Sequence, residues 1–154
     1  MSSRLALIIM ALTSFWPQKS ASVADLLLKD QVAEAEAQLN KEARTAGTIA
    51  LRGEIEYRKG NLDQAGSLYQ QALKMDSKSA RAHFGLGKLA MAKLKDKEAV
   101  QEMARAIALE PGEPLYRLYA SEAYALQKNY TEQMKQLQEY IRMNPNDPVA
   151  RPSS

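Results

Sequence analysis

The chain has 154 residues, of which 45% are hydrophobic and 25% are charged, and this composition is typical of one folded domain. It contains no cysteine and a single histidine, His83, so disulfide bonds, thiolate metal sites and cysteine nucleophiles are excluded, and little remains for a histidine-based metal site or catalytic triad. Lys and Arg outnumber Asp and Glu by 21 to 18, an excess too small to predict binding to nucleic acid.

The N-terminal segment has the order of a secretory signal peptide. Arg4 precedes an uncharged stretch from Leu5 to Trp16, and the small residues at 22–24, Ser-Val-Ala, follow as a cleavage site. The apolar stretch has about 12 residues, whereas a membrane-spanning helix needs roughly 20. We expect residues 1–24 to be a signal peptide and the protein to be exported, either periplasmic or extracellular. The alternatives are a membrane tether formed by an uncleaved N-terminus and a buried N-terminal helix in a cytoplasmic protein.

Residues 25–45 have the pattern of a short helical hairpin. A run of three leucines at positions 26–28 comes before a polar turn at 29–31, and the stretch AEAEAQL follows. The two helices would be shorter than those of the repeats that come next in the chain. We therefore expect this segment to be a degenerate hairpin that caps the repeats.

A 34-residue repeat organises the chain after residue 45. Its blocks are 46–79, 80–113 and 114–147, and each has the pattern of two helices joined by a turn. A shift by 34 residues superposes Gly53 on Gly87, Ala65 on Ala99, Ala72 on Ala106, and Pro111 on Pro145. With this period and these residues the chain resembles the tetratricopeptide repeat (TPR) family. The resemblance implies an all-α fold, a right-handed solenoid of helical hairpins with three full repeats after the degenerate N-terminal hairpin.

The recurring small residues are expected to lie where helices approach closely, because a larger side chain would hold the backbones apart. Within a hairpin we expect glycine to face alanine. Between hairpins we expect alanine to allow the two neighbouring helices to approach closely. The pairs within hairpins are Gly53 with Ala65 and Gly87 with Ala99, and the residues between hairpins are Ala72 and Ala106.

The last block departs from the repeat. Pro111 and Pro145 are expected to end the second helices of their blocks, and residues 148–154 are expected to form a disordered tail. Tyr140 occupies a position where the neighbouring blocks have alanine, and Tyr140 and Met143 are expected to leave an apolar end. Such an end favours self-association, so a homodimer formed through the last repeat is the alternative function.

The resemblance also implies a binding surface. In the TPR family the first helices line a concave groove, and positions 2, 5, 9, 12 and 13 of each repeat face the ligand. Offsets of three and four residues keep these positions on one side of a helix. Carried onto this chain, they give the candidate groove residues Glu54, Tyr57, Arg58, Arg81, Phe84, Lys88, Met91, Leu115, Leu118, Glu122 and Leu126. Alternatively, these side chains only cover the surfaces of their helices and bind no partner.

The groove is expected to hold an extended peptide or a partner helix. The expected anchors are aromatic or apolar: Tyr57, Phe84, Met91 and Leu118. The expected readers of acidic groups are basic: Arg58, Arg81 and Lys88. Chaperone-binding members of the family hold a C-terminal carboxylate with Lys and Asn side chains. This chain has Ala50 and Glu54 at the first two of those positions, so we do not expect that activity.

These patterns predict a non-catalytic scaffold or assembly factor of the cell envelope. The segment 85–90, Gly-Leu-Gly-Lys-Leu-Ala, matches a dinucleotide-binding fingerprint as a string, but it lies inside a predicted helix and lacks the preceding strand and tight turn. No nucleophile, base and orienting group are expected to converge. We therefore expect a protein or peptide partner, and no enzymatic activity, cofactor, metal ion or nucleic acid.

Overall fold

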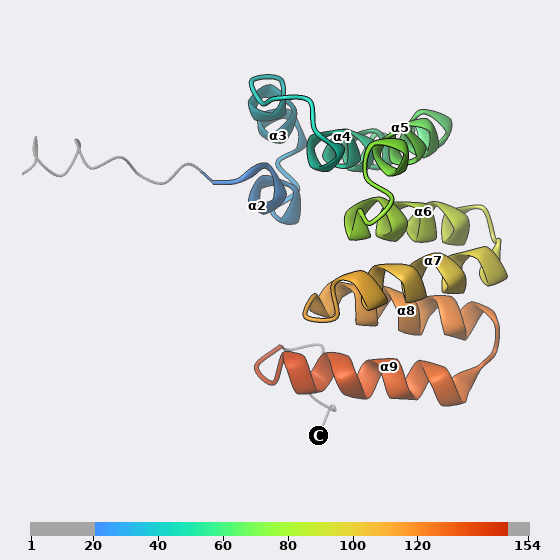
Figure 1. Ribbon diagram of the computed structural model, residues 1–154. Coiled ribbons are helices and arrows are strands. Elements are labelled where there is room, and N and C mark those ends of the chain that lie inside the picture. The colour runs from blue at the N-terminus through green and yellow to red at the C-terminus, as the bar shows by residue number, and fades with distance from the viewer. Residues whose placement is uncertain (1–20, 148–154) are drawn as a thin grey trace, which may run out of the picture.

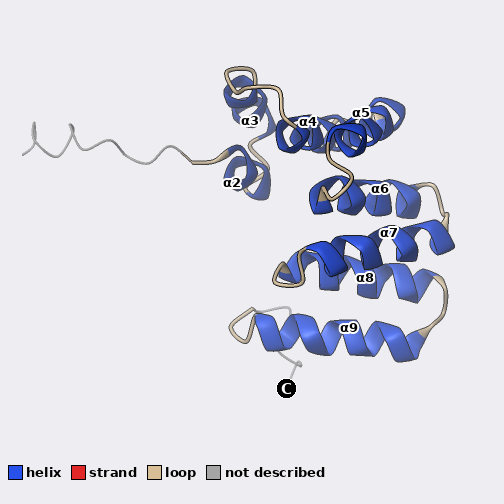
Figure 2. Ribbon diagram, viewed as in Figure 1, coloured by secondary structure: helices blue, strands red, loops and turns tan. Residues whose placement is uncertain are grey.

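The computed structural model describes residues 21–147, so most of the predicted signal peptide and all of the predicted tail lie outside the described residues. This part contains eight α-helices and no strand. The helices are α2 (Val23–Leu28), α3 (Val32–Leu39), α4 (Ala46–Arg58), α5 (Leu62–Met75), α6 (Ala80–Ala92), α7 (Asp96–Leu109), α8 (Pro114–Leu126) and α9 (Tyr130–Met143). They pair into hairpins that stack as a curved arch (Figure 1, Figure 2). The predicted all-α solenoid of helical hairpins is confirmed.

Each 34-residue block contains one hairpin, and the hairpins turn in the same way. The turning residue has a left-handed backbone in all three, with φ of 84° at Gly60, 55° at Leu94 and 58° at Lys128. A left-handed residue lets the next amides bond to the last carbonyls of the helix. Glycine adopts this conformation freely, whereas a residue with a side chain is strained by about 1–2 kcal/mol. The recurrence at Leu94 and Lys128 therefore shows that the packing of the hairpin sets the turn.

Local chemistry sets where the other helix ends fall. The Ser79 hydroxyl accepts a hydrogen bond from the Ala82 amide at the start of α6, and Pro114 is the first residue of α8. Pro111 and Pro145 each lie two residues after the last residue of α7 and α9. Between residues 21 and 147 no helix has the length and hydrophobicity that crossing a membrane requires.

Gly53 and Gly85 make room for the buried ring of Tyr69. A Cβ atom added to Gly53 would lie 2.6 Å from the ring, and one added to Gly85 would lie closer still. Such distances are shorter than any van der Waals contact, so a side chain at either position would displace the ring. The sequence prediction paired Gly53 with Ala65 and did not foresee this contact with Tyr69. Ala65 is also buried, but the ring of Tyr69 occupies the space that Gly53 leaves.

Gly87 plays the same part for Met103 in the next hairpin. A Cβ atom on Gly87 would lie 2.8 Å from the methyl carbon of Met103, so Met103 is the side chain that would have to shift first. The alanines expected between hairpins do lie there. Ala72 belongs to a buried cluster that reaches α6, and Ala106 belongs to one that reaches α8.

The N-terminal hairpin packs onto α4 through a small core of its own. This core contains Val23, Leu27, Ala35 and Leu39 together with Ile55 of α4. The guanidinium of Arg52 on α4 also donates hydrogen bonds to the Leu39 carbonyl at 3.1 Å and to the Asn40 side chain at 2.8 Å. These bonds satisfy acceptors at the end of α3, which has no further helical turn to bond them.

The predicted cleavage after Ala24 would fall inside α2. Val23 is the first residue of this helix and is buried in the core of the hairpin. Ser22 and Asp25 form a reciprocal capping box, in which each side chain accepts a hydrogen bond from the backbone of the other. The hairpin therefore begins two residues earlier than the predicted boundary at residue 25.

A chain that begins at Asp25 is expected to hold this hairpin less firmly than a chain that begins at Ala21. It loses the helix cap, with a cost of about 0.5–2 kcal/mol, and the burial of Val23, with a cost of about 1.5–3 kcal/mol. Hydrogen exchange of the α3 amides should therefore be at least roughly tenfold faster in the shorter chain. Equal exchange rates in the two chains would contradict this role of Val23.

Candidate functional site

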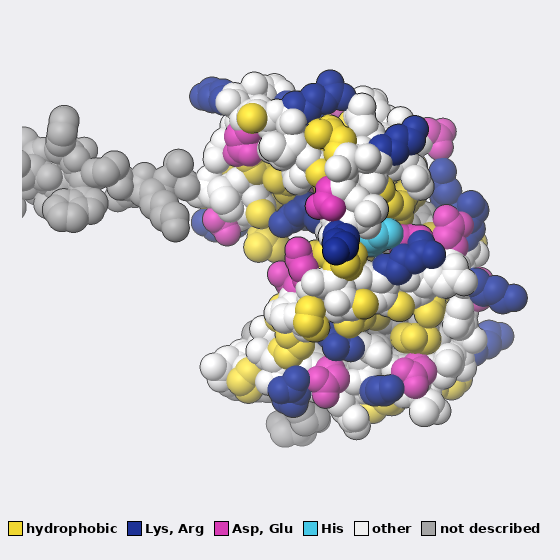
Figure 3. All heavy atoms as spheres, viewed as in Figure 1, with side chains coloured by type: hydrophobic (Ala, Val, Ile, Leu, Met, Phe, Trp, Pro, Cys, Tyr) yellow, Lys and Arg dark blue, Asp and Glu magenta, His cyan; other side chains and the backbone are white. Residues whose placement is uncertain are grey.

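The concave side of the arch holds a cavity of about 280 Å³. It appears as the hollow in the space-filling view (Figure 3). Helices α2, α4, α6 and α8 provide most of its wall. Six of the predicted groove residues line it: Glu54, Arg58, Arg81, Phe84, Lys88 and Leu115. The other lining residues are Ala24, Leu27, Leu28, Ala50, Tyr69, Glu110, Glu113, Tyr116 and Tyr119. We call this cavity and its wall the groove.

The five remaining predicted residues do not line the cavity. Met91 packs against the core between α7 and α8, so its predicted role as an anchor is not supported by its position. Leu118 is half-buried, and Leu126 is exposed at the end of α8. Tyr57 lies over Lys88, one of the lining residues. Glu122 lies beyond the lining residues, and partial burial raises the pKa of its carboxyl group.

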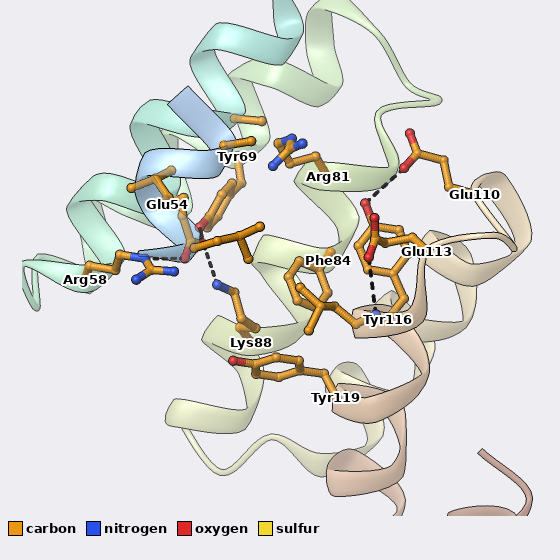
Figure 4. A pocket seen from close by; sticks show the side chains of 15 residues that line it. Glu54, Arg58, Tyr69, Arg81, Phe84, Lys88, Glu110, Glu113, Tyr116 and Tyr119 are labelled. Carbon is orange, nitrogen blue, oxygen red and sulfur yellow. Dashed lines mark hydrogen bonds and ion pairs between the residues drawn. The ribbon is translucent and has the colours of Figure 1, made fainter. Parts of the chain in front are cut away.

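The carboxylate of Glu54 is the centre of a polar network on one wall of the groove (Figure 4). It accepts hydrogen bonds from the Lys88 ammonium, from Arg58 Nε at 2.9 Å and from the Tyr69 hydroxyl at 3.3 Å. Arg58 also pairs with Asp30 of the N-terminal hairpin at 3.1 Å. Glu54 and Lys88 are 34 residues apart, so the ion pair joins the same position of two successive repeats.

Lys88 is buried, with 6% of its side chain exposed. Its ammonium lies 4.8 Å from the ring centre of Tyr57, 5.1 Å from that of Phe84 and 5.9 Å from that of Tyr119. Burial lowers the pKa of Lys88, and the Glu54 carboxylate opposes this shift. The aromatic faces and the carboxylate together replace the water that the ammonium has lost.

Of the three basic residues expected to read acidic groups, only Arg81 is available. Lys88 and Arg58 are already paired with Glu54, so their charges are largely neutralised. Arg81 lines the cavity and forms no hydrogen bond or ion pair with any residue between 21 and 147 (Figure 4). A ligand with an acidic group would therefore meet one free guanidinium in the groove, not three.

The opposite wall combines aromatic rings with carboxylates that bond within the protein. Phe84 and Tyr116 lie with their ring centres 4.7 Å apart. The Tyr116 hydroxyl donates a hydrogen bond to Glu110 at 3.2 Å, and the Leu115 amide donates one to Glu113 at 3.3 Å. Burial of the phenol, together with the charge of Glu110, raises the pKa of Tyr116. The wall thus offers apolar surface, with its nearby acidic groups bonded inside the protein.

Some lining residues escaped prediction from the sequence. Leu27 and Leu28 come from the degenerate hairpin, whose orientation relative to the repeats cannot be read from its own pattern. Tyr116 and Tyr119 occupy positions three apart on α8, and this aromatic spacing is a signal that could have placed both on one helix face. Tyr69 is a core residue whose hydroxyl reaches the groove.

The part of the groove that the structure describes holds neither a metal-ligating cluster nor the histidine. Among residues 21–147 no group of three or more His, Asp or Glu side chains could hold a metal ion. His83 lies outside the cavity wall, where its ring nitrogens bond to the Glu102 carboxylate at 2.7 Å and the Ser77 carbonyl at 3.3 Å. The exposed side chains that line the cavity are Leu28, Arg58, Arg81 and Glu110, and the exposed fraction of Leu28 is 68%.

The end of the solenoid differs from the sequence prediction. Tyr140 is buried, and its hydroxyl donates a hydrogen bond to Asp147, so Tyr140 is not part of an exposed apolar end. Met143 is half-buried. The exposed apolar side chains of α9 are instead Tyr130, Met134 and Ile141.

Solved structures with the same fold come from several kinds of protein. YrrB, described as a TPR protein with an unusual peptide-binding site, has a TM-score of 0.62 and 18% identity, over 83% of this chain and 68% of that one. The first TPR domain of Spaghetti (RPAP3), bound to the HSP90 peptide SRMEEVD, has a TM-score of 0.65 and 16% identity, over 71% of this chain and 86% of that one. The type III secretion translocator chaperone SycD of Yersinia enterocolitica, in an alternative dimer, has a TM-score of 0.62 and 18% identity, over 70% of this chain and 82% of that one. These likenesses show a shared fold.

No curated protein matches the chain in sequence. The family of the chain is shown by its sequence, because the sequence profile of the tetratricopeptide repeat matches residues 51–114 and 97–148. These two ranges together cover more than half of the chain and include all three full hairpins except the first five residues of α4. The hairpin geometry, the 34-residue period and this match agree, and the chain belongs to the tetratricopeptide repeat family.

Proposed function

We propose that this protein is a non-catalytic interaction module that binds an extended peptide segment or a helix of a protein partner in the groove. The observation that carries the proposal is the cavity on the concave side, which combines exposed Leu28, the Phe84 ring and the free guanidinium of Arg81. Peptide binding by YrrB and by the TPR domain of Spaghetti supports this choice of ligand. The proposed function requires no cofactor, metal ion or nucleic acid.

The size of the cavity limits what it can hold. Small-molecule sites usually enclose roughly 300–1,000 Å³, and this cavity of about 280 Å³ lies below that range. It suits one or two large side chains of a longer segment whose remaining residues lie along the groove. Phe84 and Leu115 offer apolar surface for such a side chain, and Arg81 can pair with an adjacent acidic group.

A peptide-display selection with the full chain as bait tests this function. Leu28→Lys and Arg81→Glu alter the groove, whereas Met75→Lys is a matched exposed change at the end of α5, outside the cavity wall. The selected peptides should bind the natural chain and Met75→Lys alike, and should lose at least about tenfold in affinity for each groove variant, about 1.4 kcal/mol. Selected peptides that bind all three variants equally, or a selection that enriches none, would overturn the proposal.

We propose further that the protein acts in the cell envelope after export. The order of residues 1–24 supports this location. N-terminal sequencing of the protein from fractionated cells tests it. A processed chain in the periplasm or medium is the expected result, and a full-length chain in the membrane fraction would favour the tethered alternative. A full-length chain in the cytoplasm would contradict export.

Self-association through the last repeat is the second candidate function. The observation that favours it is the row of exposed apolar side chains on α9: Tyr130, Met134 and Ile141. A mass that rises with protein concentration, in the absence of any partner, would distinguish this function from binding in the groove.

A further inference from the structure

One side of α9 carries an apolar stripe along the whole helix. The exposed fractions are 63% for Tyr130, 54% for Met134 and 41% for Ile141, and half-buried Leu137 lies between the last two. The intervals are four, three and four residues, which keep the four side chains on one side of a helix. We call these four residues the α9 stripe.

The repeat shows what such a stripe does elsewhere in the molecule. A shift by 34 residues places Met134, Leu137 and Ile141 on Val100, Met103 and Ile107 of α7, which pack in one cluster with Ala120 and Ala123 of α8. The stripe therefore corresponds to the surface that the first helix of a following hairpin covers. Within residues 21–147, α9 is the last layer of the arch and no helix covers this side (Figure 1).

We propose that α9 of a second copy of this chain covers the stripe in an antiparallel arrangement; the inference rests on the second candidate function. A two-fold axis midway between Met134 and Leu137 places Met134 of one copy opposite Leu137 of the other. The same axis places Tyr130 opposite Ile141, because the two pairs of residue numbers have the same sum. The stripe is thus complementary to itself in this one register.

The charges of α9 are placed where they do not oppose this contact. Glu132 pairs with Lys135 at 3.6 Å, and Glu139 pairs with Arg142 at 2.8 Å. At 100° per residue these four side chains lie on the side of the helix away from the stripe. Gln133 and Gln138, which border the stripe on its two sides, are uncharged. A second copy would therefore meet apolar and neutral polar groups, without repulsion between like charges.

The size of the contact predicts a weak dimer. Fourteen residues at 1.5 Å per residue make a seam about 21 Å long. Two single helices of this length bury less than the roughly 800 Å² per partner of a standard interface. We therefore expect association in the micromolar range or weaker, visible as a mass that rises with concentration.

The register can be tested by exchanging charges across the axis. In the full chain, Tyr130→Lys and Ile141→Glu should each weaken the dimer by about tenfold, since each puts a charge opposite an apolar side chain. The double variant should recover most of the affinity, because each Lys then faces a Glu of the other copy. In a parallel dimer the double variant would instead place like charges together. Residues 130 and 141 are 11 apart in one helix, too far to pair within the copy.

Sedimentation equilibrium measures the dimer affinity of each protein. The samples are the natural chain, both single variants, the double variant and the control Lys135→Gln. Loss with each single variant and recovery in the double variant supports the antiparallel seam. A dimer that no α9 variant weakens overturns the seam but leaves self-association standing, and single losses without recovery overturn the antiparallel register. A natural chain that stays monomeric at every concentration overturns both. Circular dichroism shows whether each variant keeps its helices.

Discussion

Replacing Glu54 with alanine is expected to destabilise the folded chain by about 3–5 kcal/mol, because it leaves the ammonium of Lys88 buried without its carboxylate. Lys88 is only 6% exposed, so water replaces little of the lost partner. The same change removes the acceptor of Arg58 and of the Tyr69 hydroxyl. Urea unfolding monitored by circular dichroism measures the loss as a change in midpoint at constant slope.

The matched control removes both charges of the pair at once. The double variant Glu54→Leu and Lys88→Met keeps the volumes of the side chains and leaves no buried charge, so its stability is expected to lie within about 1–2 kcal/mol of the natural chain. Arg58 retains Asp30 as a partner in this variant. A double variant as unstable as Glu54→Ala would show that the cost has another origin than the unpaired ammonium.

Replacing Tyr69 with alanine is expected to cost about 3–5 kcal/mol, the range for removing a large side chain from a packed core. The ring fills the space that Gly53 and Gly85 leave open, so its removal creates a cavity that backbone atoms of α4 and α6 cannot close. Because the ring joins two hairpins, the loss should also reduce the cooperativity of unfolding between them. Thermal and urea unfolding of the variant, with probes in each hairpin, measure both effects.

The complementary change enlarges Gly85. Its new methyl group in Gly85→Ala would overlap the Tyr69 ring, with an expected cost of about 1–3 kcal/mol, although alanine in a helix by itself gains up to about 1 kcal/mol over glycine. Combining Gly85→Ala with Tyr69→Leu should recover part of the loss of either single variant, since the smaller side chain leaves room for the methyl group. Additive losses in this double-mutant cycle would contradict a direct contact between residues 69 and 85.

The helices could be predicted from the sequence because their signals are local. The 34-residue period, the turn at Gly60 and the prolines Pro111 and Pro145 all act over a few residues, and the six helices from α4 to α9 fall within the predicted blocks. The start of α2 was misplaced because it depends on contacts with other helices and not on a local signal. The small residues 22–24 match a cleavage site as a string, whereas in the fold Val23 is buried by contacts with α3 and α4.

The groove could be predicted only in part. The resemblance to the TPR family placed Arg81, Phe84 and Lys88 on the groove side of α6, and helical spacing agrees, because residues three and four apart share one side of a helix. It could not show that Glu54 cancels the charge of Lys88, since this pair forms across two repeats. The contribution of Leu28 was also missed, because it depends on how the N-terminal hairpin docks on α4.

The sequence by itself determined the class of fold, the number of full hairpins and the side of each helix that faces its neighbours. The fold and the number of hairpins follow from the 34-residue period and the family resemblance that rests on it, and the sides of the helices follow from helical spacing. Only the tertiary structure decided that Tyr69 lies between Gly53 and Gly85 and that Lys88 is paired within the groove. Such partners depend on the distance and angle between helices, which are set by packing among side chains from different hairpins and appear in no single helix's pattern.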